Sequence, residues 1–271
     1  MAIMTVDESR PATHPFVLGH GAWAGGWVWK RVAPLLRAQG HDVFTPTLTG
    51  LGERVHLARP DIDLDTHIQD IVNLLVYEDL DNAVLVGWSY GGMVAAGVLD
   101  RAPERLAHVV YLDADVPRDG ESDFDVAGPE FREEMEQRAQ SAGDGWKASI
   151  GDAETIDAFF RTWLPDVEMR RWLAAKLASS GQPIETFRQP IRLSNAAADA
   201  VSRTFIRCPI DGATWAGIYD PIAERLRGDS RYRVIELASN HLAPLVAPTA
   251  VTEALVAIAH QLPITAGRTA T

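Results

Sequence analysis

The chain has 271 residues, of which 46% are hydrophobic and 23% are charged, a composition typical of a globular protein and not of intrinsic disorder. Asp and Glu number 37 against 25 Lys and Arg, so the formal net charge is −12. Because no basic run offsets this charge, nucleic acid is not an expected partner. The single cysteine, Cys208, excludes an intramolecular disulfide and a cysteine-rich metal site.

The N-terminal stretch MAIMTVDESRPATHP does not resemble a secretory signal, because it has neither a basic segment nor an apolar one. No segment approaches the roughly 18 uninterrupted apolar residues that a membrane span requires. We therefore expect a cytoplasmic protein that does not bind membranes.

Six short apolar runs, most of them rich in Val, Ile and Phe and bounded by turn residues, predict buried strands. In chain order they cover residues 16–20, 42–47, 83–88, 107–113, 203–208 and 231–237. Helical patterns lie between them. One, at residues 65–78, places its apolar side chains on one face, and others follow Trp27, Ser89 and Pro248. The alternation predicts an α/β fold with a mostly parallel six-stranded core sheet flanked by helices.

The alternation of strands and helices stops after the fourth predicted strand, where about 90 residues contain helical stretches and no clear strand. An insertion of this size predicts a helical cap, or lid, over one end of the sheet. We expect residues 1–117 and 201–271 to form the core domain and residues 118–200 to form the cap. Trp146, Trp163 and Trp172 of this segment either line a pocket or anchor the cap to the core.

The strongest local signal is Gly87-Trp88-Ser89-Tyr90-Gly91-Gly92, which lies between a predicted strand and a predicted helix. This is the G-x-S-x-G pattern of a nucleophilic serine. A sharp turn exposes the serine oxygen above the sheet, at a helix N-terminus that favours developing negative charge. In this context Ser89 is the predicted nucleophile.

A nucleophilic serine needs a base and an acid that orients the base. His241 is the predicted base, because it lies in the loop LASNHLAP between the last predicted strand and the last helix. Asp211, in the loop PIDGAT, is the predicted acid and gives the chain order serine, acid, histidine. Asp113, which ends the strand before the cap, is the alternative acid.

The tetrahedral oxyanion requires backbone N–H donors. The residue after the nucleophile, Tyr90, is one expected donor, and the loop HGAWAGGW after the first strand provides the other, expected at Ala22. We expect the ring of His20 to brace this loop. The loop lacks a following Lys-Ser/Thr, so it does not indicate nucleotide binding.

Together FVLGHGAWAGGWVW, GWSYGG, the acid in FIRCPID and the base in SNHL resemble the α/β-hydrolase superfamily. They are most similar to the branch of plant methyl-ester esterases and hydroxynitrile lyases and their bacterial relatives. The resemblance covers the chain from Phe16 to about Ala259 and implies the α/β-hydrolase fold. In that branch the acid ends a run that begins with an aromatic and a hydrophobic residue, which Phe205, Ile206 and Asp211 match.

That branch contains two chemistries. Its lyases carry a threonine directly after the histidine of the first loop and a lysine directly after the catalytic histidine. Here these positions are Gly21 and Leu242. Gly21 leaves the oxyanion hole open to an ester carbonyl, and Leu242 provides no cation for cyanide, so the resemblance implies an esterase.

We therefore expect a serine hydrolase that cleaves a small carboxylic ester through an acyl-enzyme, without a metal ion or an organic cofactor. Trp88 and Tyr90 flank the predicted nucleophile, and Trp23 lies in the loop after the first strand, so these bulky aromatic residues favour an apolar or aromatic substrate. The expected substrate-binding residues are Gly21, Trp23, Trp88 and Leu242. The alternatives are a carbon–carbon lyase, or another non-hydrolytic use of the triad, and a small-molecule receptor.

Overall fold

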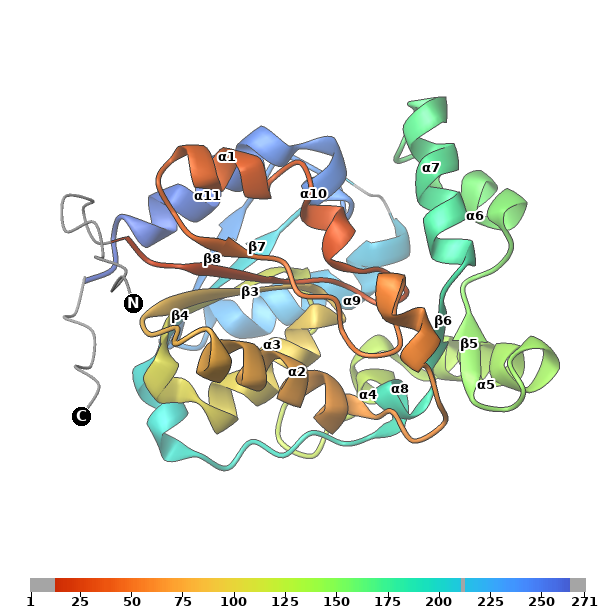
Figure 1. Cartoon of the computed structure of the whole chain (residues 1–271), viewed down its shortest axis with the longest axis horizontal. Coiled ribbons are helices and arrows are strands. Elements are labelled where there is room, and N and C mark those ends of the chain that lie inside the picture. Colours follow the sequence, from red (N-terminus) through yellow and green to blue (C-terminus); the bar gives the residue numbers. More distant parts are fainter. Residues whose placement is uncertain (1–12, 211–212, 264–271) are drawn as a thin grey trace, which may run out of the picture.

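The central sheet has six strands, all parallel, in the order β2-β1-β3-β4-β7-β8 (Figure 1). The computed structural model describes residues 13–210 and 213–263, with backbone only for 213–216. The strands are β1 (Phe16–Gly19), β2 (Val43–Phe44), β3 (Ala83–Ser89), β4 (Leu106–Ala114), β7 (Ser202–Arg207) and β8 (Tyr232–Glu236). All six strands predicted from the sequence are confirmed, each within a few residues of its predicted ends.

Helices cover both faces of this sheet. They are α1 (Ala33–Ala38), α2 (Leu64–Tyr77), α3 (Gly91–Arg101), α9 (Ala213–Arg227), α10 (Ala243–Val246) and α11 (Pro248–Ala259), with short 3-10 turns η1 (Gly26–Trp29), η2 (Gly52–Leu57) and η3 (Pro103–Arg105). In Figure 1, α1 and α11 lie above the sheet, whereas α2 and α3 lie below it. Helix α2 is capped at its N-terminus by Asp63, whose side chain accepts a hydrogen bond from the Thr66 N–H.

The core is apolar because β1, β3 and β4 are covered on both faces, so their residues cannot alternate between water and the interior. Phe16, Val84, Val86 and Val110 are all fully buried. In a parallel sheet the carboxyl ends of all strands meet at one edge, and loops that follow those ends carry the candidate site.

Residues 115–201 connect β4 to β7, and the part from residue 117 to residue 201 is called the insert below. The insert contains α4 (Asp123–Ala127), α5 (Pro129–Ala142), β5 (Lys147–Ser149), α6 (Ala153–Phe160), α7 (Val167–Ala178), β6 (Gly181–Pro183), α8 (Glu185–Arg188) and η4 (Ala196–Ala200). Helices α5, α6 and α7 extend beyond the sheet, at the right of Figure 1.

The expectation of an insert without strands is wrong in one respect. Strands β5 and β6 pair antiparallel, with Ala148 opposite Gln182. Each has three residues, and β6 reads Gly-Gln-Pro, so neither has the alternation or β-branched content that predicts a strand. Their pairing depends on the helices that bring them together.

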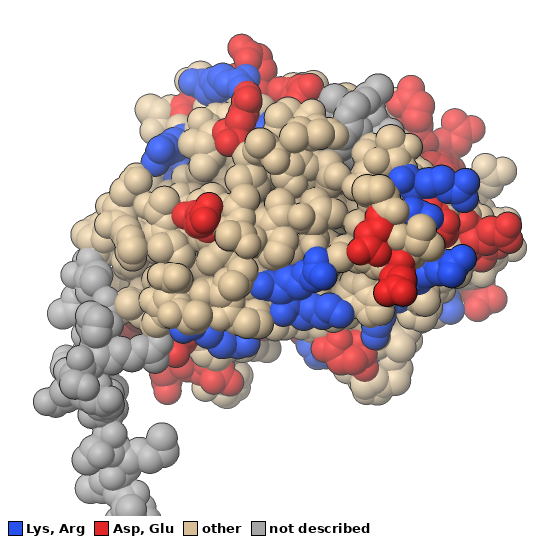
Figure 2. Space-filling model, turned by 90° about the horizontal axis from the view of Figure 1, so that it is seen from above, with Lys and Arg blue, Asp and Glu red and all other residues tan. Residues whose placement is uncertain are grey.

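The charge on the face seen in Figure 2 is mixed. Lys and Arg side chains lie among Asp and Glu side chains, mostly over the insert, and a broad area over the core carries almost no charge. This face has no continuous basic patch. Within the described residues, no helix is long and apolar enough to cross a bilayer.

Candidate active site

Ser89 ends β3 at the carboxyl edge of the sheet and is followed directly by α3. Its φ angle is +56°, in the left-handed region that a residue with a Cβ rarely adopts. The strained turn between strand and helix exposes the side chain of Ser89 at the edge of the sheet, which is the geometry predicted from the G-x-S-x-G pattern.

The glycines around Ser89 allow a close approach of neighbouring backbone. A Cβ on Gly87 would lie 2.4 Å from the Gly91 carbonyl oxygen, and one on Gly92 would lie 2.0 Å from the carbonyl oxygen of Asp115. A side chain at Gly87 would push β3 away from α3, and one at Gly92 would push α3 away from the segment that follows β4, so both positions require glycine.

His241 lies in the loop after β8, at the same edge of the sheet, and is 5% exposed. Its Nδ1 donates a hydrogen bond of 3.0 Å to Oδ2 of Asp113. Because Nδ1 carries the proton in this bond, Nε2 is the nitrogen available as a base. The structure thus joins the predicted base to the carboxylate that the sequence offered as the alternative acid.

Asp113 reaches His241 because of an irregularity in β4. Trp88 of β3 pairs with Leu112 and Ser89 pairs with Ala114, so Asp113 is an extra residue in the strand, with a φ angle of +44°. A bulge of this kind bends a strand and redirects a side chain. Here it directs the Asp113 carboxylate toward the loop that carries His241.

The other oxygen of this carboxylate is held separately. Oδ1 of Asp113 accepts hydrogen bonds from Arg207 Nη1 at 2.8 Å and from the Cys208 N–H at 3.0 Å. Asp113 is fully buried and Arg207 is nearly so, at 2% exposed. These two donors compensate the buried charge and leave Oδ2 for His241. Arg207 Nε also donates to Asp220 of α9 at 2.6 Å.

Asp211, which the sequence predicts as the acid, lies outside the described residues. Its role therefore stays a prediction.

Two aromatic rings pack against the imidazole of His241. The ring of Tyr219, from α9, is nearly parallel to it at 13°, with centroids 5.3 Å apart, and Trp88 lies at the same distance with a tilt of 35°. Trp88 Nε1 also donates to the His241 carbonyl oxygen at 2.7 Å. The hydroxyl of Tyr219 lies 3.5 Å from Ser89 Oγ. Tyr219 could not be predicted from the sequence, because no motif in α9 marks it.

The loop after β1 approaches the nucleophile closely. A Cβ on Gly21 would lie 2.9 Å from Ser89 Cβ and 3.3 Å from its Oγ. The Ala22 N–H, the predicted oxyanion donor, has no protein acceptor within the described part of the chain. The space beside Ser89 therefore depends on glycine at position 21.

His20 braces this loop, as expected from the sequence. Its Nε2 accepts a hydrogen bond from the Leu48 N–H at 3.0 Å, and its Nδ1 therefore donates to the Gly21 carbonyl oxygen at 2.8 Å. Burial lowers the pKa of His20 to about 4, so the ring stays neutral and keeps both bonds at neutral pH.

The same loop is tied to the insert through Trp23, whose φ angle is +57°. Its backbone N–H donates to Oε1 of Gln182 at 3.0 Å, and its indole Nε1 donates to the Ala148 carbonyl oxygen at 2.7 Å. Both acceptors belong to the β5/β6 pair. The two-stranded β5/β6 sheet that the sequence did not predict therefore holds the loop that carries Ala22.

Tyr90, the other predicted oxyanion donor, is 2% exposed, and hydrogen bonds through His67 fix its side chain. His67 Nε2 donates to the Thr49 carbonyl oxygen at 2.9 Å, and Nδ1 therefore accepts from the Tyr90 hydroxyl, also at 2.9 Å. Burial lowers the pKa of His67 to about 4, so this network involves the neutral ring. No local sequence pattern marks this role of His67, because the contact joins α2 to the turn after β3.

A cavity of about 40 Å³ lies over Ser89 and His241. Gly21, Ala22, Trp23, Trp88 and Leu242 all line it, so the residues predicted to bind substrate surround the predicted nucleophile. The insert contributes only apolar side chains to the lining: Ile150, Phe160, Leu173 and Leu177.

The insert's tryptophans are not among the lining residues. Trp172 packs edge-on against Trp27 of the core with centroids 5.1 Å apart, and Lys30 Nζ lies 3.9 Å from its ring. Trp163 accepts a hydrogen bond on its carbonyl oxygen from Asn240, the neighbour of His241. Of the two roles left open by the sequence, these contacts favour anchoring for Trp163 and Trp172.

Two buried carboxyl groups lie near Ser89 and His241. Asp115 follows β4 and donates its backbone N–H to the Ser89 carbonyl oxygen at 3.1 Å, and Asp123 begins α4. They are 5% and 3% exposed. Burial raises the pKa of Asp115 to about 7, and burial together with Asp115 raises that of Asp123 well above its ordinary value.

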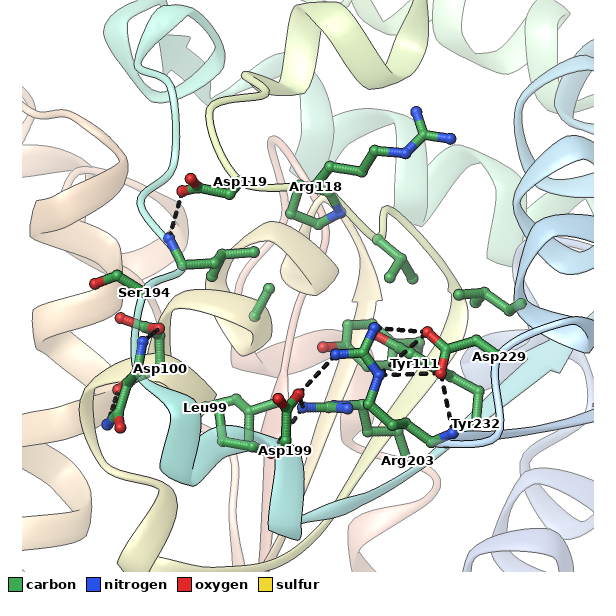
Figure 3. A pocket seen from close by; sticks show the side chains of 18 of the residues that line it. Leu99, Asp100, Tyr111, Arg118, Asp119, Ser194, Asp199, Arg203, Asp229 and Tyr232 are labelled. Carbon is green, nitrogen blue, oxygen red and sulfur yellow. Dashed lines mark hydrogen bonds and ion pairs between the residues drawn. The ribbon is translucent and has the colours of Figure 1, made fainter.

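A larger cavity, of about 610 Å³, lies away from Ser89, between α3 and α9 (Figure 3). It shares no described lining residue with the cavity over Ser89. Figure 3 shows Asp199, Arg203 and Asp229 gathered beside Tyr232. Arg231 bonds both Asp229 and Asp199, so much of the charge at this end is internally neutralised.

Metal-binding geometry is not found in the part of the chain that the structure describes, since no three His, Cys, Asp or Glu side chains there are grouped to hold an ion.

Comparison with known proteins supports the class that the fold and site define. The family model described as "Alpha/beta hydrolase family" matches residues 16–254. The carbendazim hydrolyzing esterase of Nocardioides sp. (strain SG-4G) is 33% identical over 251 residues, which is 90% of this chain and 98% of that protein. Methylesterase 2 of Arabidopsis thaliana is 31% identical over 58% of this chain and 59% of its own length.

Solved structures show the same fold. An extracellular α/β-hydrolase from a Paenibacillus species superposes with a TM-score of 0.77 at 22% identity, covering 92% of this chain and all of that one. A pyrethroid hydrolase from Sphingobium faniae JZ-2 gives a TM-score of 0.72 at 21% identity, covering 92% and 98%.

The chain belongs to the alpha/beta hydrolase family. Within that family it is an enzyme of the carboxylic ester hydrolase type.

Proposed function

We propose that the chain is a serine esterase in which Ser89 attacks the ester carbonyl and His241 accepts the proton of its hydroxyl group. The observation that carries the proposal is the hydrogen bond from His241 Nδ1 to Asp113, in a site where Ser89 and His241 line one cavity. This bond fixes the tautomer in which Nε2 is a base. His241 then protonates the leaving alcohol, and water attacks the acyl-enzyme with help from the same nitrogen.

The oxyanion of each tetrahedral intermediate accepts hydrogen bonds from the N–H groups of Ala22 and Tyr90. The His20 bonds and the Trp23 contacts support the Ala22 position, and the bond from Tyr90 to His67 supports the other. Donors held in place before the reaction need no rearrangement as charge develops, which is why such holes lower the barrier.

Asp113 is the acid in this proposal, because its carboxylate bonds to His241 and is itself held by Arg207. Asp211 is the competing candidate from the sequence. Replacing each by Asn distinguishes them. Loss of the orienting acid lowers kcat by about 10³- to 10⁴-fold, whereas the other replacement costs far less. If Asp211→Asn is the damaging change, the assignment of Asp113 is wrong.

The substrate is a small ester with an apolar or aromatic body, since Ser89 and His241 are the only polar side chains that line the cavity among the described residues. We propose that the insert is a lid over this cavity. A volume of about 40 Å³ is far below the roughly 300–1,000 Å³ of typical ligand pockets. Substrate entry therefore requires Phe160, Leu173 and Leu177 to move away from the core.

A fluorophosphonate probe tests the nucleophile without knowledge of the substrate. We expect one adduct, located on Ser89 by mass spectrometry, and none on the Ser89→Ala variant. Ser180→Ala, which removes a buried serine of the insert, is the matched control and retains labelling. An unlabelled but folded wild-type protein would contradict the proposal and favour the receptor.

Gly21 and Leu242 both line the cavity, and neither provides the threonine or lysine of the related lyases. No observation therefore favours the lyase over the esterase.

A further inference from the structure

Tyr219 occupies a place beside the catalytic residues that the reaction above does not use. It lies in α9 and is 2% exposed. Its ring is nearly parallel to that of His241, with the centroids 5.3 Å apart. Helix α9 is held by the bond from Arg207 Nε to Asp220, and Arg207 also bonds Asp113. One guanidinium therefore fixes the acid and the helix that carries Tyr219.

The hydroxyl of Tyr219 lies 3.5 Å from Ser89 Oγ, which is long for a hydrogen bond between two hydroxyl groups. Catalytic hydrogen bonds are often long before substrate binds and shorten in the reacting complex. The distance places the phenol next to the atom that forms and breaks the covalent bond to substrate.

The direction of this contact follows from the surroundings of the phenol. Burial and the nearby carboxyl groups of Asp115, Asp113 and Asp123 raise the pKa of Tyr219 well above its ordinary value. The phenol therefore keeps its proton throughout the neutral range, and Tyr219 is the donor when Oγ carries negative charge.

We propose that Tyr219 is a further catalytic residue of this esterase, whose hydroxyl group donates a hydrogen bond to Ser89 Oγ while that oxygen carries charge. Its ring is in addition a positioning element for His241, through stacking. The inference rests on the proposed function, since it assigns a role around a nucleophilic Ser89.

The chemistry balances without transfer of the phenol proton. In acylation, His241 takes the Oγ proton as the bond from Oγ to the carbonyl carbon forms, and the alcohol leaves with that proton. In deacylation, His241 takes a proton from water, and the bond between Oγ and the acyl carbon breaks as His241 returns a proton to Oγ. Attack by Oγ and its expulsion are reverse steps, so a donor to Oγ assists both.

Two substitutions separate the hydroxyl from the ring. Tyr219→Phe removes the hydroxyl and keeps the stacked ring, whereas Tyr219→Leu removes both. The control is Tyr111→Phe, which removes the hydroxyl of an equally buried tyrosine in β4, next to Tyr232. Each protein is measured for the rate of fluorophosphonate labelling, for kcat and KM on a 4-nitrophenyl ester, for the pH dependence of kcat/KM and for Tm.

For Tyr219→Phe we expect the labelling rate and kcat each to fall by about 10- to 100-fold, the loss typical of a hydrogen bond to a charged atom. KM, the pH midpoint and the Tm difference should match those of Tyr111→Phe. For Tyr219→Leu we expect a larger fall in kcat and a shifted pH midpoint, because the stacked ring is gone.

A Tyr219→Phe variant within twofold of wild type in both rates would overturn the catalytic role. An equal loss of rate in Tyr111→Phe would also overturn it, because the effect would then belong to the fold. If wild type is not labelled at Ser89, both the esterase proposal and this inference fail. If wild type is labelled and Tyr219→Phe is unimpaired, only this inference fails.

Discussion

The backbone N–H of Trp23 donates a hydrogen bond of 3.0 Å to the side chain of Gln182, which joins the loop carrying Ala22 to strand β6 of the insert. Gln182 is fully buried, and its Nε2 donates to Thr186 at 2.7 Å. The side chain of Gln182 is thus hydrogen-bonded both to the backbone of the core loop and to a side chain of the insert. The loop that carries Ala22 and the insert are therefore expected to respond together to changes at this residue.

The Gln182→Met substitution keeps the size of this side chain and removes both polar contacts. We expect the free energy of unfolding to fall by about 1–3 kcal/mol, because the Trp23 N–H loses its acceptor in a buried site. We also expect kcat to fall at least tenfold if that N–H fixes the position of Ala22. Urea unfolding and ester kinetics measure the two effects. Gln189→Met, at an exposed contact with Asp65, is the control and should leave both unchanged.

The Gly21→Ala substitution tests the space beside the nucleophile. The added Cβ would lie 2.9 Å from Ser89 Cβ, a distance that real Cβ atoms essentially never show, so the loop or Ser89 must shift. A displacement of this order at a reacting centre costs about 10²-fold in rate. We expect kcat/KM to fall by about that factor while Tm changes little. Unchanged kinetics would mean that the loop does not need to approach Ser89 this closely.

His67 makes stability depend on pH in the acid range. Its pKa is about 4 in the folded protein and 6.5 as the ordinary value, so the unfolded chain binds more protons between these limits. The stability that the neutral ring contributes is fully present above pH 6.5 and is lost as the pH falls toward 4, by about 3 kcal/mol.

For His67→Phe we expect a less stable protein at pH 7.5, because Thr49 and Tyr90 lose their partner, but a flatter stability curve between pH 6.5 and 4. Urea unfolding at several pH values measures the slope. His56→Asn, at an exposed position, should keep the wild-type slope. A wild-type slope in His67→Phe would contradict the assignment.

Asp115 has the opposite effect on the pH dependence of stability: its contribution decreases as the pH rises. Its pKa is raised to about 7 in the folded protein, so the contribution of the buried neutral carboxyl is complete below pH 3.8 and is lost as the pH rises through 7. We expect Asp115→Asn, which stays neutral, to match wild type near pH 4 and to exceed its free energy of unfolding by about 1 kcal/mol or more at pH 8. A variant that is less stable than wild type at pH 8 would show that the carboxylate is needed there.

Local sequence patterns were sufficient for much of this molecule. The six strands, the turn at Ser89 and the loop position of His241 all follow from residues that are neighbours in the chain, because strand burial and a strained turn demand particular residue types locally. The predicted lining residues Gly21, Trp23, Trp88 and Leu242 were found for the same reason, since each lies next to a motif.

Contacts between distant segments could be decided only by the tertiary structure. Asp113 bonds to His241 because a bulge in β4 redirects its side chain, and no local pattern marks that bulge. The β5/β6 pair and Tyr219 are similar cases, in which helices far apart in sequence bring short or unmarked segments together. Local residue patterns indicate which backbone conformation is favoured at each position in the chain. Which two side chains meet depends on how the whole sheet and insert pack.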